Sequence, residues 1–147
     1  MLNDIITLPE EHLRYISHEN TGTVLIIRIE STNTEATCPY CGTVSNKVHS
    51  RYTRKLQDLP IQGKKVRLYL NNKKYFCMNA ECRRKTFAEQ FEFYEPNSVR
   101  TKRLQDEILR LSLTQSSISA SKYLRNSIAD VGKSTICDML KKGRKNH

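Results

Sequence analysis

The chain has 147 residues, of which 25 are Lys or Arg and 15 are Asp or Glu, so its net charge is +10. This length allows one ordinary domain or two small ones, and small domains bury so little apolar surface that they need an additional stabilising element. No apolar run is long enough to span a membrane, and the chain does not open with a secretion signal. The composition therefore predicts a soluble, cytoplasmic protein that does not bind membranes.

The positive charge is distributed unevenly along the chain. Met1–Thr37 carries two basic and six acidic residues, a net charge of −4, so Cys38–His147 carries +14. Because Lys and Arg neutralise phosphates, a field of this sign favours nucleic acid as the partner. The alternative is a basic surface that is simply solvated. The segment from Cys38 onward is the predicted contact surface.

Several runs in the first two thirds of the chain predict β-strands. The β-branched run Val24–Ile29 predicts a strand at the edge of a small sheet. Apolar and polar residues alternate in Lys65–Leu70, which indicates a strand with one buried face. Pro60–Gly63 separates that strand from Ser50–Leu59 and predicts the turn of a hairpin. Lys74–Cys77 is interpreted as a further strand.

The pattern changes to helical spacing after residue 97. Leu104, Ile108 and Leu111 recur at the spacing of one helix face from Thr101 onward. Two further helices are predicted at Ser116–Arg125 and at Lys133–Lys142, the second beginning near Gly132. We therefore expect an α+β chain, with a small β-rich domain that includes an N-terminal strand in residues 1–97 and a three-helix domain in residues 98–147.

Four of the five cysteines form two pairs, Cys38 with Cys41 and Cys77 with Cys82, and the predicted hairpin lies between the pairs. Zinc binds four thiolates tetrahedrally, and the two- and four-residue spacers lie in its usual range. Gly42 permits the tight backbone bend that follows the second cysteine. The spacing predicts one structural zinc ion, and metal binding of this kind contributes about 10–16 kcal/mol of apparent folding energy.

The alternatives to a zinc site are weaker. Disulfides would require an oxidising compartment, and nothing indicates secretion. A redox Cys-x-x-Cys motif would leave the second pair unexplained. His49 could replace a ligand or contact phosphate, but a single histidine beside a strand is more often packed or solvated. The fifth cysteine, Cys137, has apolar neighbours in a predicted helix and is interpreted as a buried bystander.

The three predicted helices favour a helix-turn-helix, in which the last helix lies in the major groove and reads bases with its N-terminal residues. If Ile136, Met139 and Leu140 pack inward, a polar face remains for DNA. The base-contacting residues predicted on that face are Lys133, Ser134, Thr135 and Asp138. The β-rich domain of residues 1–97 is thus predicted to be a small zinc ribbon, and residues 98–147 a three-helix helix-turn-helix domain.

Taken in order, these features resemble the ISL-three family of bacterial insertion-sequence transposases, whose chains open with a zinc ribbon and a helix-turn-helix. The resemblance extends over nearly the whole chain and is specific in its combination of motifs. The segments that carry it are Leu8–Pro9, Val24–Glu30, Cys38–Gly42, Val48–Tyr52, Leu56–Pro60, Val66–Leu68, Tyr75–Cys77, Cys82, Arg84 and Thr86–Glu89. The resemblance implies recognition of the terminal inverted repeats of a mobile element in double-stranded DNA.

Members of that family continue into an RNase H-like domain whose acidic triad binds two divalent metals. Two-metal chemistry needs carboxylates that converge from one rigid sheet. The available aspartates are scattered over different predicted elements: Asp58, Asp106, Asp130 and Asp138. We therefore expect no catalytic residue and no enzymatic activity in this chain.

The sequence thus predicts a zinc-dependent DNA-binding module of a transposase. Basic residues of the hairpin are expected to hold the phosphates without reading sequence; they are Arg51, Arg54, Lys55, Lys64, Lys65 and Arg67. One rival is an active transposase that is completed by frameshifting or by a second polypeptide. The other rival is an interaction module that pairs with a second copy or with a full-length transposase and inhibits it.

Overall fold

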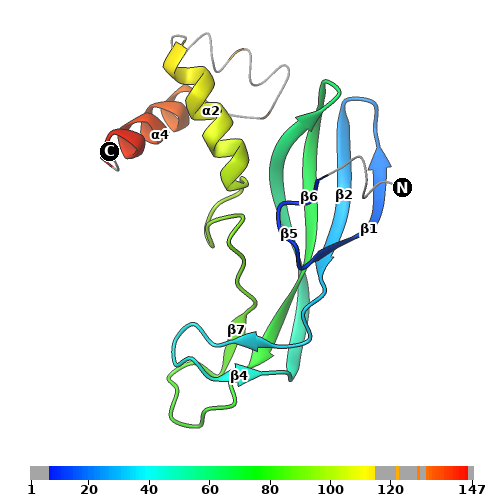
Figure 1. Ribbon diagram of the computed structural model, residues 1–147, viewed down its shortest axis with the longest axis vertical. Helices are drawn as coiled ribbons and strands as arrows, with labels where there is room; N and C mark the ends of the chain where they lie inside the picture. Colours follow the sequence, from blue (N-terminus) through cyan, green and yellow to red (C-terminus); the bar gives the residue numbers. More distant parts are fainter. Residues whose placement is uncertain (1–6, 115–121, 123–128, 130–131, 146–147) are drawn as a thin grey trace.

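The computed structural model describes residues 7–114, 122, 129 and 132–145. Strands dominate this part of the chain, and two helices follow them (Figure 1). The elements are β1 (Leu13–Asn20), β2 (Val24–Ser31), β3 (Ala36–Thr37), β4 (Val44–Ser45), β5 (Val48–Ile61), β6 (Lys64–Phe76), β7 (Thr86–Ala88), α2 (Lys102–Thr114) and α4 (Lys133–Lys145).

Five of the strands form one sheet in the order β1-β2-β6-β5, with β7 paired to the far end of β6. Strands β2 and β6 run parallel, and all other neighbours in this sheet are antiparallel. The expectation that Val24–Ile29 lies at a sheet edge is wrong, because β1 covers that edge. Nor is Lys74–Cys77 a separate strand: Lys74–Phe76 is the end of β6.

The main core lies on one face of this sheet. Alternate residues of β2 and β6 point into it, as their period-two pattern predicts. The segment after β7 crosses this face and closes the core with Phe93 and Tyr94. The buried members are Leu13, Leu25, Ile27, Ile29, Leu56, Val66, Leu68, Leu70, Phe93 and Tyr94. The opposite face of β2, β6 and β5 carries polar and aromatic side chains together with Val24 and Ile26 of β2, and these side chains are partly buried or exposed.

The long hairpin of β5 and β6 is confirmed, and its turn consists of only two residues. Ile61 pairs with Lys64 across the turn. Gln62 and Gly63 both have positive φ angles, 50° and 76°. Positive φ at both central residues is the geometry of a type I′ turn, whose twist matches that of the flanking strands. Pro60 lies where the pairing shifts register between Asp58 and Ile61, so its missing N–H costs no regular ladder bond.

Helices α2 and α4 pack against each other, and α2 also contacts β5, while α4 lies on the side of α2 away from the sheet (Figure 1). Leu104 and Ile108 of α2 meet Ile136 of α4, and all three are fully buried. Leu59 of β5 packs against this cluster, so the helical cluster is joined to the edge of the sheet. The predicted starts near Thr101 and Gly132 agree with the structure, where the N–H of Ile136 donates to the carbonyl of Gly132.

The expectation of a three-helix helix-turn-helix domain after a small ribbon is wrong. The described residues are β-rich and contain two short helices, while the predicted helix Ser116–Arg125 lies outside them apart from Lys122. The apolar stripes of α2 and α4 do not form a helical core of their own, because Leu59 of the hairpin packs against the same cluster. The domain boundary near residue 97 stays a prediction.

A buried carboxylate joins the sheet to the first helix. Asp58 of β5 is 3% exposed and accepts hydrogen bonds from the Thr101 hydroxyl (2.8 Å) and from Arg103 Nε (2.8 Å) and Nη2 (2.5 Å). Arg103 Nη1 also donates to the carbonyl of Thr7. Alongside, the backbone of Gln57 exchanges hydrogen bonds with Val99 and Thr101. This arrangement, termed the Asp58 latch below, fixes the start of α2 against the edge of β5.

We expect Asp58→Asn to lower the free energy of unfolding by about 2–3 kcal/mol. Removing one partner of a buried ion pair costs about 3–5 kcal/mol. The expected loss is smaller here because the Arg103 side chain is 32% exposed and water can solvate it. Urea unfolding measures the change. Glu107→Gln, which breaks the exposed Glu107–Arg110 pair on α2, is the control and should have a much smaller effect. Equal effects would show that the Asp58 latch contributes nothing special.

The hairpin turn gives a second stability prediction. Asn adopts positive φ several-fold more readily than Gln does, so Gln62→Asn should stabilise the protein by about 0.5–1 kcal/mol. Gly63→Ala should destabilise it by about 1–2 kcal/mol through backbone strain alone, because no atom lies within 4 Å of the added Cβ. Thermal unfolding of both variants tests the turn; stabilisation by Gly63→Ala would contradict it.

Candidate metal centre and basic surfaces

The first cysteine pair lies on a tight turn between the short strands β3 and β4. The N–H of Cys38 donates to the carbonyl of Thr43 (2.9 Å), and the N–H of Gly42 donates to the carbonyl of Cys38 (2.9 Å). Gly42 has a φ of 79°, a conformation that side chains rarely adopt. The glycine therefore closes the turn that aims Cys41 back toward Cys38, as the sequence predicts.

The second pair lies between the end of β6 and the start of β7. The N–H of Cys77 donates to the carbonyl of Lys85 (2.8 Å), and that of Cys82 donates to the carbonyl of Asn79 (3.1 Å). The Asn79 side chain accepts a further hydrogen bond from the N–H of Glu81. These bonds fold the four-residue spacer into a compact loop with both thiols on its inner side.

The four sulfur atoms of Cys38, Cys41, Cys77 and Cys82 all lie within 4.8 Å of one another. The separation is 3.5 Å between Cys41 and Cys77 and 4.0 Å between Cys38 and Cys82. A tetrahedral ion with Zn–S bonds of about 2.3 Å requires sulfur separations of about 3.8 Å. The cluster fits one structural zinc ion with four thiolate ligands, as the sequence predicts.

In the absence of metal, neighbouring groups shift the pKa values of Cys41 and Cys77 in opposite directions. A hydrogen bond with the Thr43 side chain, whose Oγ1 is 3.4 Å from the Cys41 sulfur, lowers the pKa of Cys41 to about 6. At Cys77 the Asn79 backbone lowers the pKa, but burial and the neighbouring thiols outweigh it and raise the pKa to about 12. Zinc must therefore displace the Cys77 proton, so its affinity rises with pH.

A small aromatic core supports the metal centre. Tyr75 and Phe87 stack with ring centroids 5.8 Å apart, and both are buried beside Cys38. The cysteines Cys77 and Cys82 pack against the same cluster. These few side chains bury little surface, so the metal has to supply much of the stability of this end of the molecule.

The structure spreads the predicted phosphate contacts over both faces of the hairpin. Lys55 and Arg67 share the face opposite the main core, where Lys55 stacks over Tyr69 at 5.1 Å. Arg51 is exposed further along β5, and Lys64 and Lys65 follow the turn at the start of β6. Their contacts with DNA stay predictions.

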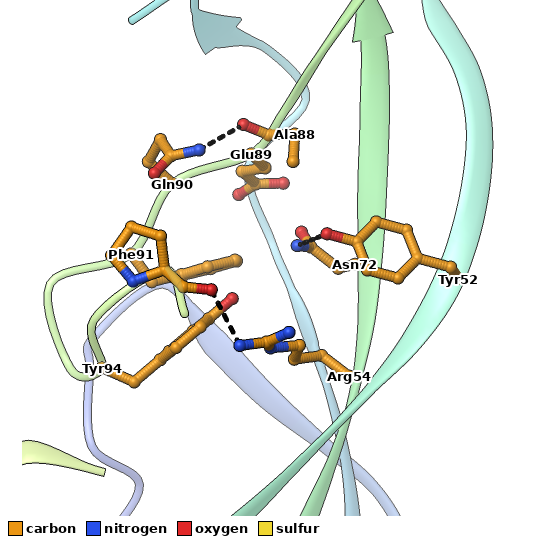
Figure 2. A pocket seen from close by; sticks show the side chains of 9 residues that line it. Tyr52, Arg54, Asn72, Ala88, Glu89, Gln90, Phe91 and Tyr94 are labelled. Atoms are coloured by element: carbon orange, nitrogen blue, oxygen red, sulfur yellow. Dashed lines mark hydrogen bonds between the residues drawn. The ribbon is translucent and has the colours of Figure 1, made fainter. Parts of the chain in front are cut away.

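Arg54 points to the opposite, core-facing side. Its Nη2 donates to the carbonyls of Pro96 (2.8 Å) and Ser98 (2.7 Å), and its guanidinium lies 5.6 Å from the Tyr94 ring centre. In Figure 2 it borders a pocket with Glu89 on the far side. Glu89 is 4% exposed, and neither carboxylate oxygen has a protein hydrogen-bond partner. The polar lining leaves room for ordered water between these groups.

The predicted base contacts lie in the first turns of α4. Lys133, Ser134 and Asp138 are exposed, and Thr135 is partly buried. As predicted, Ile136 is buried, with Met139 and Leu140 packed beside it against α2. His49 is not among the clustered ligands: its ring contacts Ser50 and lies edge-on to Phe76 at 4.8 Å. Cys137 lies on α4, away from the four-cysteine cluster.

Sequence reasoning missed two features. The partners of Asp58 were not identified, although its place on the buried face of β5 was a usable signal. The exposed apolar side chains beside the cysteines were also missed, including Tyr40 at 59% and Met78 at 57% exposure. The sequence indicates them by a large apolar residue inside each cysteine pair, because a ribbon core this small cannot bury such residues.

We expect the purified chain to contain one zinc per molecule and to lose the structure of this end when zinc is removed. Cys82→Ser should abolish stoichiometric zinc, whereas Cys137→Ser should retain it, because Cys137 lies outside the cluster. Metal analysis and thiol titration before and after chelation test this. Four thiols that react equally fast with and without zinc would contradict the site. Zinc retention should also fall as the pH is lowered.

The comparisons with known proteins identify one region. Residues 34–87 match the family model described as the zinc-finger of transposase IS204/IS1001/IS1096/IS1165. No curated protein and no solved structure matches the chain. Within the described residues, no helix is both long and apolar enough to cross a membrane. The matched residues include all four clustered cysteines, so residues 34–87 are similar to the zinc ribbon of these transposases and form a zinc-binding module.

Proposed function

We propose that the chain is a zinc-stabilised DNA-binding module of a transposase. The resemblance to ISL-three transposases points to the terminal inverted repeats of a mobile element as the target. The observation that carries the proposal is a basic surface on the solvent-facing side of the sheet, directly continuous with the zinc ribbon through β5 and β6.

This surface has cations from three adjacent strands. Arg28 of β2 and Lys55 of β5 flank Tyr69 of β6, at 5.7 and 5.1 Å from its ring centre. Arg67 lies opposite Gln57 in the next row across the hairpin. An open hollow adjoins these residues and is lined by Lys55, Leu56, Gln57, Arg67, Tyr69 and Val99. We term this the outer sheet face.

The outer sheet face suits a polyanion better than an apolar ligand. Its centre combines basic side chains with an aromatic ring, and both are common partners of phosphates and sugars. Glu30, an acidic neighbour on β2, is paired with Arg14. The charge of +14 carried by Cys38–His147 adds a long-range attraction toward DNA. Base contacts from the start of α4 remain part of the proposal.

The test is binding of the zinc-loaded chain to duplex DNA over a range of salt concentrations. Each phosphate contact contributes about 0.9 to the slope of log K against log salt. The double variant Lys55→Gln/Arg67→Gln should therefore flatten the slope by about 2. Arg110→Gln, which removes the same kind of charge from α2, is the control and should leave the slope unchanged.

A zinc-loaded chain that binds no duplex at low salt would overturn the proposal. The role of an interaction module that inhibits a full-length transposase would then be favoured, and co-purification with such a protein would test it. Binding that the double variant leaves unchanged would retain DNA as the partner but remove the outer sheet face from the contact surface.

A further inference from the structure

A group of exposed apolar side chains surrounds the metal centre. Tyr40 is 59% exposed, Val44 50%, Phe76 36% and Met78 57%. Together with the cations Lys47 and Arg84, these four residues form what we term the ribbon tip. Contiguous exposed apolar groups rimmed by polar residues mark interaction surfaces in soluble proteins. The end of the molecule that holds the cysteine cluster therefore carries a second candidate interaction surface, separate from the outer sheet face.

The metal centre brings together the two cysteine loops that carry Tyr40 and Met78. Tyr40 directly precedes Cys41 and Met78 directly follows Cys77, and the sulfurs of these two cysteines are 3.5 Å apart. Tyr40 and Met78 therefore come from the two cysteine loops at the point where the loops converge. The backbone positions of both residues are therefore set by the same ligand geometry that holds zinc.

Cations surround these side chains. The Arg84 guanidinium lies 4.9 Å from the ring centre of Tyr40, and Lys47 Nζ lies 5.4 Å from that of Phe76. Arg51, Arg83 and Lys85 are also exposed in this part of the chain. Across residues 38–51 and 76–88, five basic residues face a single acidic one, Glu81. This charge favours a polyanionic partner.

We propose that the ribbon tip binds the minor groove of duplex DNA, with Tyr40 and Met78 against the sugars and base edges and Arg84 and Lys47 on the flanking phosphates. Minor-groove proteins commonly combine basic side chains with apolar ones that press between base steps. The tip consists of two loops and short strands, without the helix that most major-groove readers insert. The inference rests on the proposed function and assigns it a second contact.

The two kinds of contact predict different salt behaviour. Apolar contacts release no counterions, so Tyr40→Ser/Met78→Ser should weaken DNA binding about tenfold and leave the salt slope unchanged. Arg84→Gln should instead reduce the slope by about 1. Leu113→Gln removes an apolar side chain that is 76% exposed on α2 and should alter neither quantity. Zinc content is measured for every variant, because only zinc-loaded proteins can be compared.

The groove is tested by competition with a minor-groove-binding bisbenzimide dye on an A·T-rich duplex. The parent chain should displace the dye, and Tyr40→Ser/Met78→Ser should displace it poorly. A zinc-loaded double variant that binds with parental affinity would overturn the ribbon tip contact while leaving the proposed function intact. Loss of binding by the double variant without dye displacement by the parent would overturn the minor-groove assignment. A parent that binds no DNA would defeat the proposed function itself.

Discussion

The shared coordination of one zinc ion by two distant cysteine pairs is the constraint on which this end of the molecule depends. The pairs lie on separate loops at the end of the hairpin away from its turn, and the core around them contains few buried side chains beyond Tyr75 and Phe87. Such a core is too small to hold the loops by apolar burial alone. The metal replaces that missing burial, and it also fixes Tyr40 and Met78 at the surface, so stability and the proposed DNA contact have the same origin.

The opposite end of the hairpin is held by different interactions. There the turn of Gln62 and Gly63 joins the strands, the Asp58 latch ties β5 to α2, and Leu59 joins the helical cluster. The strands β5 and β6 extend from this end to the cysteine loops (Figure 1). One continuous pair of strands therefore connects the ribbon tip to the outer sheet face. This arrangement suits a module that contacts DNA at more than one point.

The sequence was sufficient wherever the signal was local. The cysteine spacing with Gly42, the hairpin turn, and the apolar stripes of α2 and α4 all depend on residues close together in the chain. Long-range pairing was not predictable in the same way. Strand β1 has few apolar residues and was missed, so β2 was placed wrongly at an edge, and its parallel pairing with β6 leaves no mark in either segment. The prediction of a helix-turn-helix domain was wrong because amphipathic spacing shows only that one face of a helix is buried. It does not show which other element packs against that face.

The most direct test of the central claim is the DNA affinity of one sample before zinc removal, after it and after zinc is restored. If the metal holds the ribbon tip in its binding shape, affinity for duplex DNA falls on removal and returns when one zinc per chain is added back. Far-UV circular dichroism should show that the large sheet survives meanwhile, because its core does not include the metal. Equal affinity with and without zinc would contradict the account, since DNA binding would then owe nothing to the metal-held surface.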